Sequence, residues 1–134
     1  MLKTSQKWAL AIAVIVAVGA GCTKKESKEI VVGHFGTMTG GEASFGQSTD
    51  KGIRLALEEI NAAGGVKGKQ IKVITMDNQG KAEEAVSVVT RLIEQDKVMA
   101  LIGEVASSRS IAAAPIAQAH KIPMISPAST NPKV

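Results

Sequence analysis

Short apolar runs alternate with longer amphipathic stretches over residues 30–134. Four runs consist mainly of β-branched and other apolar residues, which is typical of parallel strands buried on both faces. These runs are residues 30–35, 71–76, 99–102 and 123–125. Three stretches between them carry apolar residues three and four positions apart, the period of a helix. The predicted helices are residues 47–63, 81–96 and 108–121.

The first two helical stretches each carry a single apolar stripe. The stripes are Ile53, Ala56, Leu57, Ile60 and Ala63 in the first stretch, and Ala82, Ala85, Val86, Val89, Leu92 and Ile93 in the second. Ser48, Thr49 or Asp50 can cap the start of the first helix. Gly64-Gly65 can end it, because glycine adopts left-handed backbone angles without strain.

The third stretch contains Pro115, which lacks an N–H group and clashes with the preceding turn. We therefore expect an irregular turn over residues 107–113, followed by a regular helix with Pro115 in its first turn. The order β-α-β-α-β-α-β predicts an α/β fold. Its parallel sheet has right-handed crossovers and helices on both faces.

The first 22 residues are typical of a bacterial export signal. Lys3 and Lys7 precede the apolar run Trp8–Ala20, which is shorter than the ~20 residues of a transmembrane helix. Gly19-Ala20-Gly21-Cys22 resembles a lipobox, with Gly19 where an aliphatic residue is usual. We predict a lipoprotein signal peptide over residues 1–22 with lipid attached to Cys22, then a flexible tether over 23–29. An ordinary signal peptide and an uncleaved anchor are the alternatives.

Composition narrows the functional classes. The formal charge is +4, and it falls to about +2 without Lys3 and Lys7. With two Phe, one Trp and no Tyr, the chain offers neither the basic stripe nor the aromatic surface expected of a nucleic-acid-binding protein. The single cysteine leaves no internal disulfide to form.

Few residues suggest catalysis. The glycine-rich loop 36–46 matches neither a phosphate-binding loop nor a dinucleotide-binding fingerprint. The serines have no matched His and Asp, and His34 and His120 lie far apart in the sequence. Asp77 follows the second strand and is a candidate metal ligand or catalytic acid, but no other carboxylate or His clusters with it in the sequence, so we expect it to cap a helix. We therefore predict a protein that is not an enzyme and that uses no cofactor and no metal.

Two turns rich in hydroxyl groups follow the third and fourth strands. Ser107-Ser108 and the turn of residues 126–130 should emerge at the same carboxyl edge, where open α/β sheets bind ligands. Neutral donors at a helix start suit the carboxylate of a small zwitterion. The simpler alternative is that Ser107 only caps its helix and Thr130 only forms a turn. Phe45 either tucks onto its own domain or forms a wall beside the ligand.

Several segments match a known family in order and spacing. They are Gly36-Thr37-Met38-Thr39-Gly40, Phe45-Gly46, Gly52, residues 59–68, Asp77-Asn78, Leu101-Ile102-Gly103, Ser107-Ser108, Ile122-Pro123 and residues 125–132. From Ile30 onward the chain resembles the N-terminal part of type I periplasmic binding proteins, the branched-chain amino-acid-binding family of ABC importers. The resemblance implies that residues 30–134 are part of the first lobe of a two-lobe protein.

The resemblance also assigns roles to residues. Ser107 corresponds to the family's carboxylate-binding serine, and Ala128 and Thr130 to its second binding turn. Phe45 corresponds to an aromatic residue beside the ligand's side chain. The expected protein is an exported, lipid-anchored monomer that captures an amino acid, branched-chain in the first instance, and delivers it to a membrane permease.

Family members run to twice this length or more, and their second lobe supplies the acid that binds the ligand's ammonium group. We therefore expect the chain alone to bind leucine, isoleucine or valine weakly or not at all. Two other functional classes remain. One is a receptor-type sensory domain of the same fold, and the other is a small exported flavodoxin-like enzyme.

Overall fold

The computed structural model describes residues 29–134. The predicted signal peptide, the lipid-attachment residue Cys22 and residues 23–28 of the tether lie outside the described residues. Glu29, the last residue assigned to the tether, begins the first strand and pairs with Gln70.

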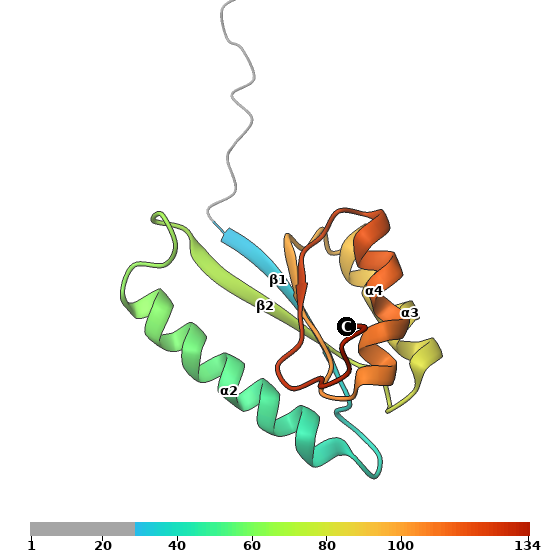
Figure 1. Ribbon diagram of the computed structural model, residues 1–134. Coiled ribbons are helices and arrows are strands. Elements are labelled where there is room, and N and C mark those ends of the chain that lie inside the picture. Colours follow the sequence, from blue (N-terminus) through green and yellow to red (C-terminus); the bar gives the residue numbers. More distant parts are fainter. Residues whose placement is uncertain (1–28) are drawn as a thin grey trace, which may run out of the picture.

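Four parallel strands form the sheet (Figure 1). They are β1 (Glu29–Gly36), β2 (Gln70–Asp77), β3 (Ala100–Ile102) and β4 (Met124–Ile125), in the spatial order β2-β1-β3-β4. Each strand lies within a residue or so of its predicted run. The parallel α/β arrangement is therefore confirmed, and the carboxyl ends of all four strands lie at one edge.

Three helices cover the two faces of the sheet (Figure 1). α2 (Ala43–Ala62) lies on one face, and α3 (Ala82–Glu94) and α4 (Ser107–Ala119) lie on the other. The prediction of helices on both faces is confirmed. Within the described range, 29–134, no helix is both long and apolar enough to cross a membrane.

The core lies between the sheet and the α3/α4 pair. Its buried members are Phe35, Ala85, Val89, Leu92, Ile93, Val98, Leu101, Ala113 and Ala117. Four of them belong to the stripe predicted for the second helix. The small Ala113 and Ala117 let α4 pack closely beside α3, because close approach needs side chains of low volume.

The α2 face is packed less completely. An apolar groove of about 490 Å³ runs between α2 and the sheet. Ile53, Ala56, Leu57 and Ile60 line it from the helix, and Val32, Ile71, Val73 and Ile102 line it from the strands. The predicted stripe of α2 therefore faces the sheet, but it is only partly buried: Ile60 remains 39% exposed.

The start of α2 differs from the prediction. The helix begins at Ala43 rather than Gln47, and no side chain caps it, so the expected caps Ser48, Thr49 and Asp50 are wrong. Asp50 lies inside the helix and accepts hydrogen bonds from Thr75 and Arg54 on its carboxylate. The helix thus reaches into the glycine-rich segment, where Gly46 packs against the backbone of Thr37.

The expected irregular turn before Pro115 is also wrong. α4 is a continuous helix from Ser107 to Ala119, with Pro115 inside it. Pro115 lies on the exposed side of α4. The ring therefore stands away from the buried face of the helix, and the helix loses only the hydrogen bond that an N–H at residue 115 would donate to the carbonyl of Ile111.

Candidate functional site

The two predicted turns meet at the carboxyl edge of the sheet. β3 and β4 pair through Leu101 with Met124 and Ile102 with Ile125, so the chain leaves both strands at the same level. Ser107 is the first residue of α4. Its Oγ accepts hydrogen bonds from the backbone N–H groups of Thr130 and Asn131, both at 3.2 Å. Ser107 and Thr130 are thus in direct contact.

A second layer of serines holds the turns together from behind. The carbonyl oxygen of Glu104 accepts hydrogen bonds from the hydroxyl groups of Ser110 (3.0 Å), Ser126 (2.8 Å) and Ser129 (3.0 Å). Ser126 Oγ also accepts a hydrogen bond from the N–H of Ser129 at 2.9 Å. These three hydroxyl groups form hydrogen bonds within the protein. The exposed residues of the second turn are Pro127, Ala128 and Thr130.

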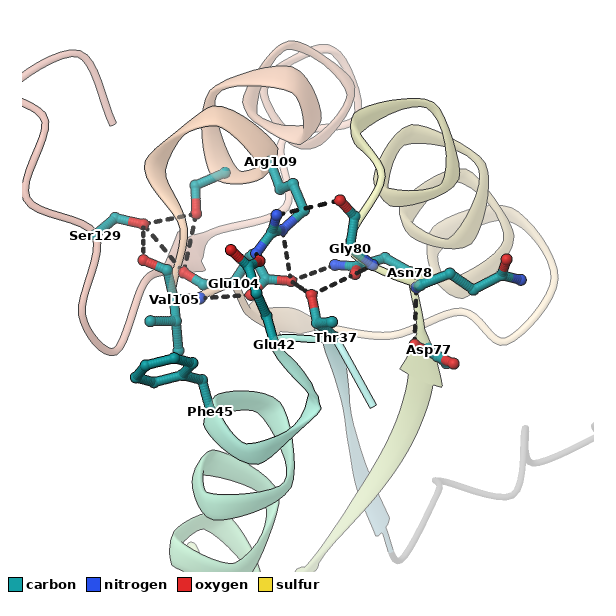
Figure 2. A network of polar contacts seen from close by, with 12 residues as sticks. Thr37, Glu42, Phe45, Asp77, Asn78, Gly80, Glu104, Val105, Arg109 and Ser129 are labelled. Carbon is teal, nitrogen blue, oxygen red and sulfur yellow. Dashed lines mark hydrogen bonds and ion pairs between the residues drawn. The ribbon is translucent and has the colours of Figure 1, made fainter. Parts of the chain in front are cut away.

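Phe45 does not tuck onto the domain. It lies in the first turn of α2 with 61% of its surface exposed, and its ring lies close to Val105 (Figure 2). A hollow of about 120 Å³ opens there, lined by Glu42, Phe45, Val105, Ala106 and Arg109. Because Ala106 directly precedes Ser107, Phe45 stands on the same side of the site as the serine turn.

A buried polar network lies behind the site (Figure 2). Glu104 follows β3 and is 1% exposed. Its Oε2 accepts hydrogen bonds from Asn78 and from Thr37 (3.1 Å), and its Oε1 accepts one from the N–H of Val105 (3.0 Å). One carboxylate therefore connects the loops that follow β1, β2 and β3.

Arg109 extends the network across the start of α4. Its Nε lies 3.3 Å from Glu104 Oε2, its Nη1 donates to the carbonyl of Gly80 (3.2 Å), and its Nη2 donates to Glu42 Oε2 (2.6 Å). The guanidinium group thus faces two carboxylates and is turned into the protein. The donors left at the serine turns are neutral, although Arg109 follows Ser107 by two residues.

Asp77 has a different role from the predicted helix cap. Its carboxylate accepts hydrogen bonds from the N–H of Met38 (2.8 Å), the hydroxyl of Thr39 (2.5 Å) and the N–H of Gln79 (2.8 Å). Burial raises the pKa of Asp77, but these hydrogen bonds outweigh it and hold the pKa below its ordinary value of 3.8. Asp77 therefore joins the loops after β1 and β2.

His34 is a buried titratable group between β1 and α2. It is 1% exposed, and its Nδ1 lies 3.5 Å from Asp50 Oδ1, at the limit of a hydrogen bond. Desolvation lowers the pKa of His34 below its ordinary value of 6.5, although the charges of Asp50 and Glu104 act to raise it. The folded protein therefore favours neutral His34.

This environment predicts a loss of stability in mild acid. As the pH falls below 6.5, the unfolded chain takes up a proton on His34 that the folded protein resists. Stability present above that pH should then decline by at most about 1.4 kcal/mol per pH unit. Chemical denaturation between about pH 5 and 7 measures this slope.

Two variants, His34→Leu and His120→Gln, show which histidine causes the change of stability with pH. We expect His34→Leu to flatten this slope. His120→Gln should leave most of it, because the half-exposed His120 lies 3.7 Å from Glu94 at the surface. An unchanged slope in His34→Leu would contradict the assignment.

The sequence did not identify the network residues Thr37, Glu42, Asn78, Glu104 and Arg109. Two signals were available: Glu104 is an acid at the end of a buried strand, and Arg109 interrupts a helix of small residues. Neither signal shows which loops are neighbours. Within residues 29–134, no three His, Cys, Asp or Glu side chains are grouped so as to hold a metal ion.

Comparison with known proteins identifies the family. Residues 29–134 match the family described as periplasmic binding protein. An amino acid binding protein of Pseudomonas aeruginosa is 39% identical over 98% of this chain and 35% of its own length. The leucine-specific-binding protein of Salmonella typhimurium is 32% identical, again over 35% of its length. The chain thus spans about a third of these relatives.

Solved structures agree with this assignment. The substrate-binding protein of a branched-chain amino acid transporter from Streptococcus pneumoniae, in complex with isoleucine, is 41% identical, with a TM-score of 0.75 over 78% of this chain and 30% of that one. A leucine-binding protein of Thermotoga maritima is also 41% identical, with a TM-score of 0.72 over 77% and 29%. The fold, the matched motifs and these similarities show that the chain belongs to the periplasmic binding protein family and corresponds to part of its first lobe.

Proposed function

We propose that this chain is the ligand-binding first lobe of a substrate-binding protein that captures amino acids, branched-chain ones in the first instance, for an ABC importer. The observation that carries the proposal is the contact between Ser107 and the backbone of Thr130 and Asn131 at the start of α4. Relatives of known structure bound to isoleucine and to leucine support this substrate class.

The arrangement suits a carboxylate. Ser107 Oγ accepts two backbone hydrogen bonds, so its own proton is available to donate outward. The first intrahelical bonds of α4 come from the N–H groups of Arg109 and Ser110 to Ala106. The N–H groups of Ser107 and Ser108 precede these bonds, so they remain as donors at the positive end of the helix. We assign Ser107, Ala128 and Thr130 to the carboxylate and Phe45 to the ligand's side chain.

The proposal extends to the partner and the location. Delivery to a membrane permease follows from membership of an importer's binding-protein family. The first 22 residues support the proposal of export through a signal peptide and of lipid attachment at Cys22. We further propose that the protein is a monomer and is not an enzyme. Loss of palmitate labelling in Cys22→Ala would support the anchor, and unchanged labelling would contradict it.

Titration with leucine, followed by amide NMR, tests the binding site. The preformed contact of Ser107 with the Thr130 turn narrows the expectation from weak or absent binding to weak binding. We expect the amides of Ser107, Ser108, Thr130 and Asn131 to shift, with a dissociation constant in the millimolar range, because one lobe supplies only half of the contacts. That affinity corresponds to about 4 kcal/mol.

Ser107→Ala is the matched variant for this titration and should abolish the shifts at Thr130 and Asn131. Shifts spread over other surfaces would contradict the proposal, and so would the absence of any shift at leucine concentrations well above the millimolar range. Calorimetry sets an upper limit on the affinity. Micromolar binding of leucine, isoleucine or valine would contradict the view that this lobe supplies only half of the binding contacts.

A further inference from the structure

The ion pair between Glu42 and Arg109 joins the start of α2 to the start of α4. Arg109 Nη2 lies 2.6 Å from Glu42 Oε2 (Figure 2). The two partners are unequally buried: the side chain of Arg109 is 10% exposed and that of Glu42 is 58% exposed. A partly exposed pair of this kind contributes little to overall stability. Its position beside the hollow suggests a local effect instead.

Arg109 is the fixed partner. Its Nη1 is held by the carbonyl of Gly80, and its Nε faces the buried Glu104 carboxylate. The planar guanidinium group therefore has a set orientation, because its nitrogens address three separate loops. Glu42 has one described side-chain contact, the one with Arg109. The pair thus ties the exposed side chain of Glu42 to an anchored group.

The position of Phe45 depends on this end of α2. No side chain caps the helix, and the backbone N–H of Phe45 donates to the carbonyl of Glu42 at 3.1 Å. Further along, Gly46 packs on Thr37, and Gln47 donates to the carbonyl of Met38. These later contacts fix the end of the first turn of α2. The ion pair with Arg109 is the side-chain contact that holds Glu42, the residue immediately before the helix.

We propose that Glu42 is a positioning residue: its ion pair with Arg109 holds the Phe45 ring over the hollow beside Ser107. The distance between the aromatic wall and the serine turn then determines how well the site accepts an apolar ligand side chain. The expected effect on ligand binding rests on the proposed function. The expected position of the Phe45 ring rests on the ion pair alone.

Fluorine NMR tests the ring position without any ligand. The chain has only two Phe residues, of which Phe35 is 0% and Phe45 61% exposed. The full chain labelled with 4-fluorophenylalanine should therefore give two well-separated signals, assigned with Phe45→Leu. We expect Glu42→Gln to shift and narrow the Phe45 signal and to leave the Phe35 signal unchanged.

The matched control is Glu83→Gln, which changes an exposed glutamate in the first turn of α3. It should leave both fluorine signals in place. A Phe45 signal with the same shift and width in Glu42→Gln as in the unaltered chain would overturn the proposal.

Leucine titration of the same proteins tests the consequence for binding. Glu42→Gln should weaken leucine binding by about fivefold, the scale of one partly exposed ion pair. In a Phe45→Leu background the same change should have no further effect. An equal loss in both backgrounds would overturn the role assigned to Glu42. If the unaltered chain does not bind leucine, the proposed function fails, and the fluorine comparison still decides the position of the ring.

Discussion

Replacing Glu104 with alanine is expected to lower the free energy of unfolding by about 3–5 kcal/mol. The variant leaves an empty buried space in which the side-chain amide N–H of Asn78 loses its acceptor and the Nε of Arg109 loses the carboxylate that it faces. Buried polar groups that lose their partner carry their full desolvation cost. Because Glu104 joins three loops at the site, the shifts induced by leucine should also disappear.

Urea denaturation of two further variants shows whether the network is responsible. Glu104→Gln keeps the shape of the side chain and should cost less than the alanine variant. Glu83→Ala, at an exposed position on α3, should change stability by no more than about 0.5 kcal/mol. A loss below about 1 kcal/mol in Glu104→Ala would show that the network is not a main support of the fold.

Replacing Gly46 with alanine is expected to destabilise the protein by about 3 kcal/mol, although alanine is the better helix former. A β-carbon at this position would overlap the carbonyl group of Thr37, which is backbone and cannot turn aside. Either α2 moves away from the loop after β1 or the loop is displaced. Both responses move the adjacent Phe45.

Gly52→Ala is a control in the same helix. Outside the neighbouring backbone of α2 itself, nothing lies within 4 Å of a β-carbon at Gly52, so the substitution should stabilise the protein by up to about 1 kcal/mol through helix propensity. Thermal unfolding of the two variants should therefore give shifts of opposite sign. Equal shifts would contradict the close approach of α2 to Thr37.

The regular elements could be predicted because their signals are local. The β-branched run over residues 71–76 and the stripe of α3, with Ala85, Val89 and Leu92, each specify one type of element. Strands alternating with helices then favour a parallel sheet. The close approach of Ser107 to Thr130 follows, because both turns leave neighbouring parallel strands at the same edge.

The remaining features depend on contacts between distant segments. The start of α2 at Ala43 is supported by packing of Gly46 on Thr37, and no capping residue marks it in the sequence. The network requires the strand order β2-β1-β3, which places the loops after Gly36, Asp77 and Ile102 side by side. Hydrophobic periodicity carries no information about that order.

Comparison of leucine with leucinamide tests the central claim most directly. Both carry the same side chain and an amino group that takes up a proton, but leucinamide has a neutral amide in place of the carboxylate. If Ser107 and the Thr130 turn bind the carboxylate, leucine should shift the amide signals of Ser108, Thr130 and Asn131, and leucinamide at the same concentration should not. Equal shifts from the two compounds would contradict a carboxylate site at these turns.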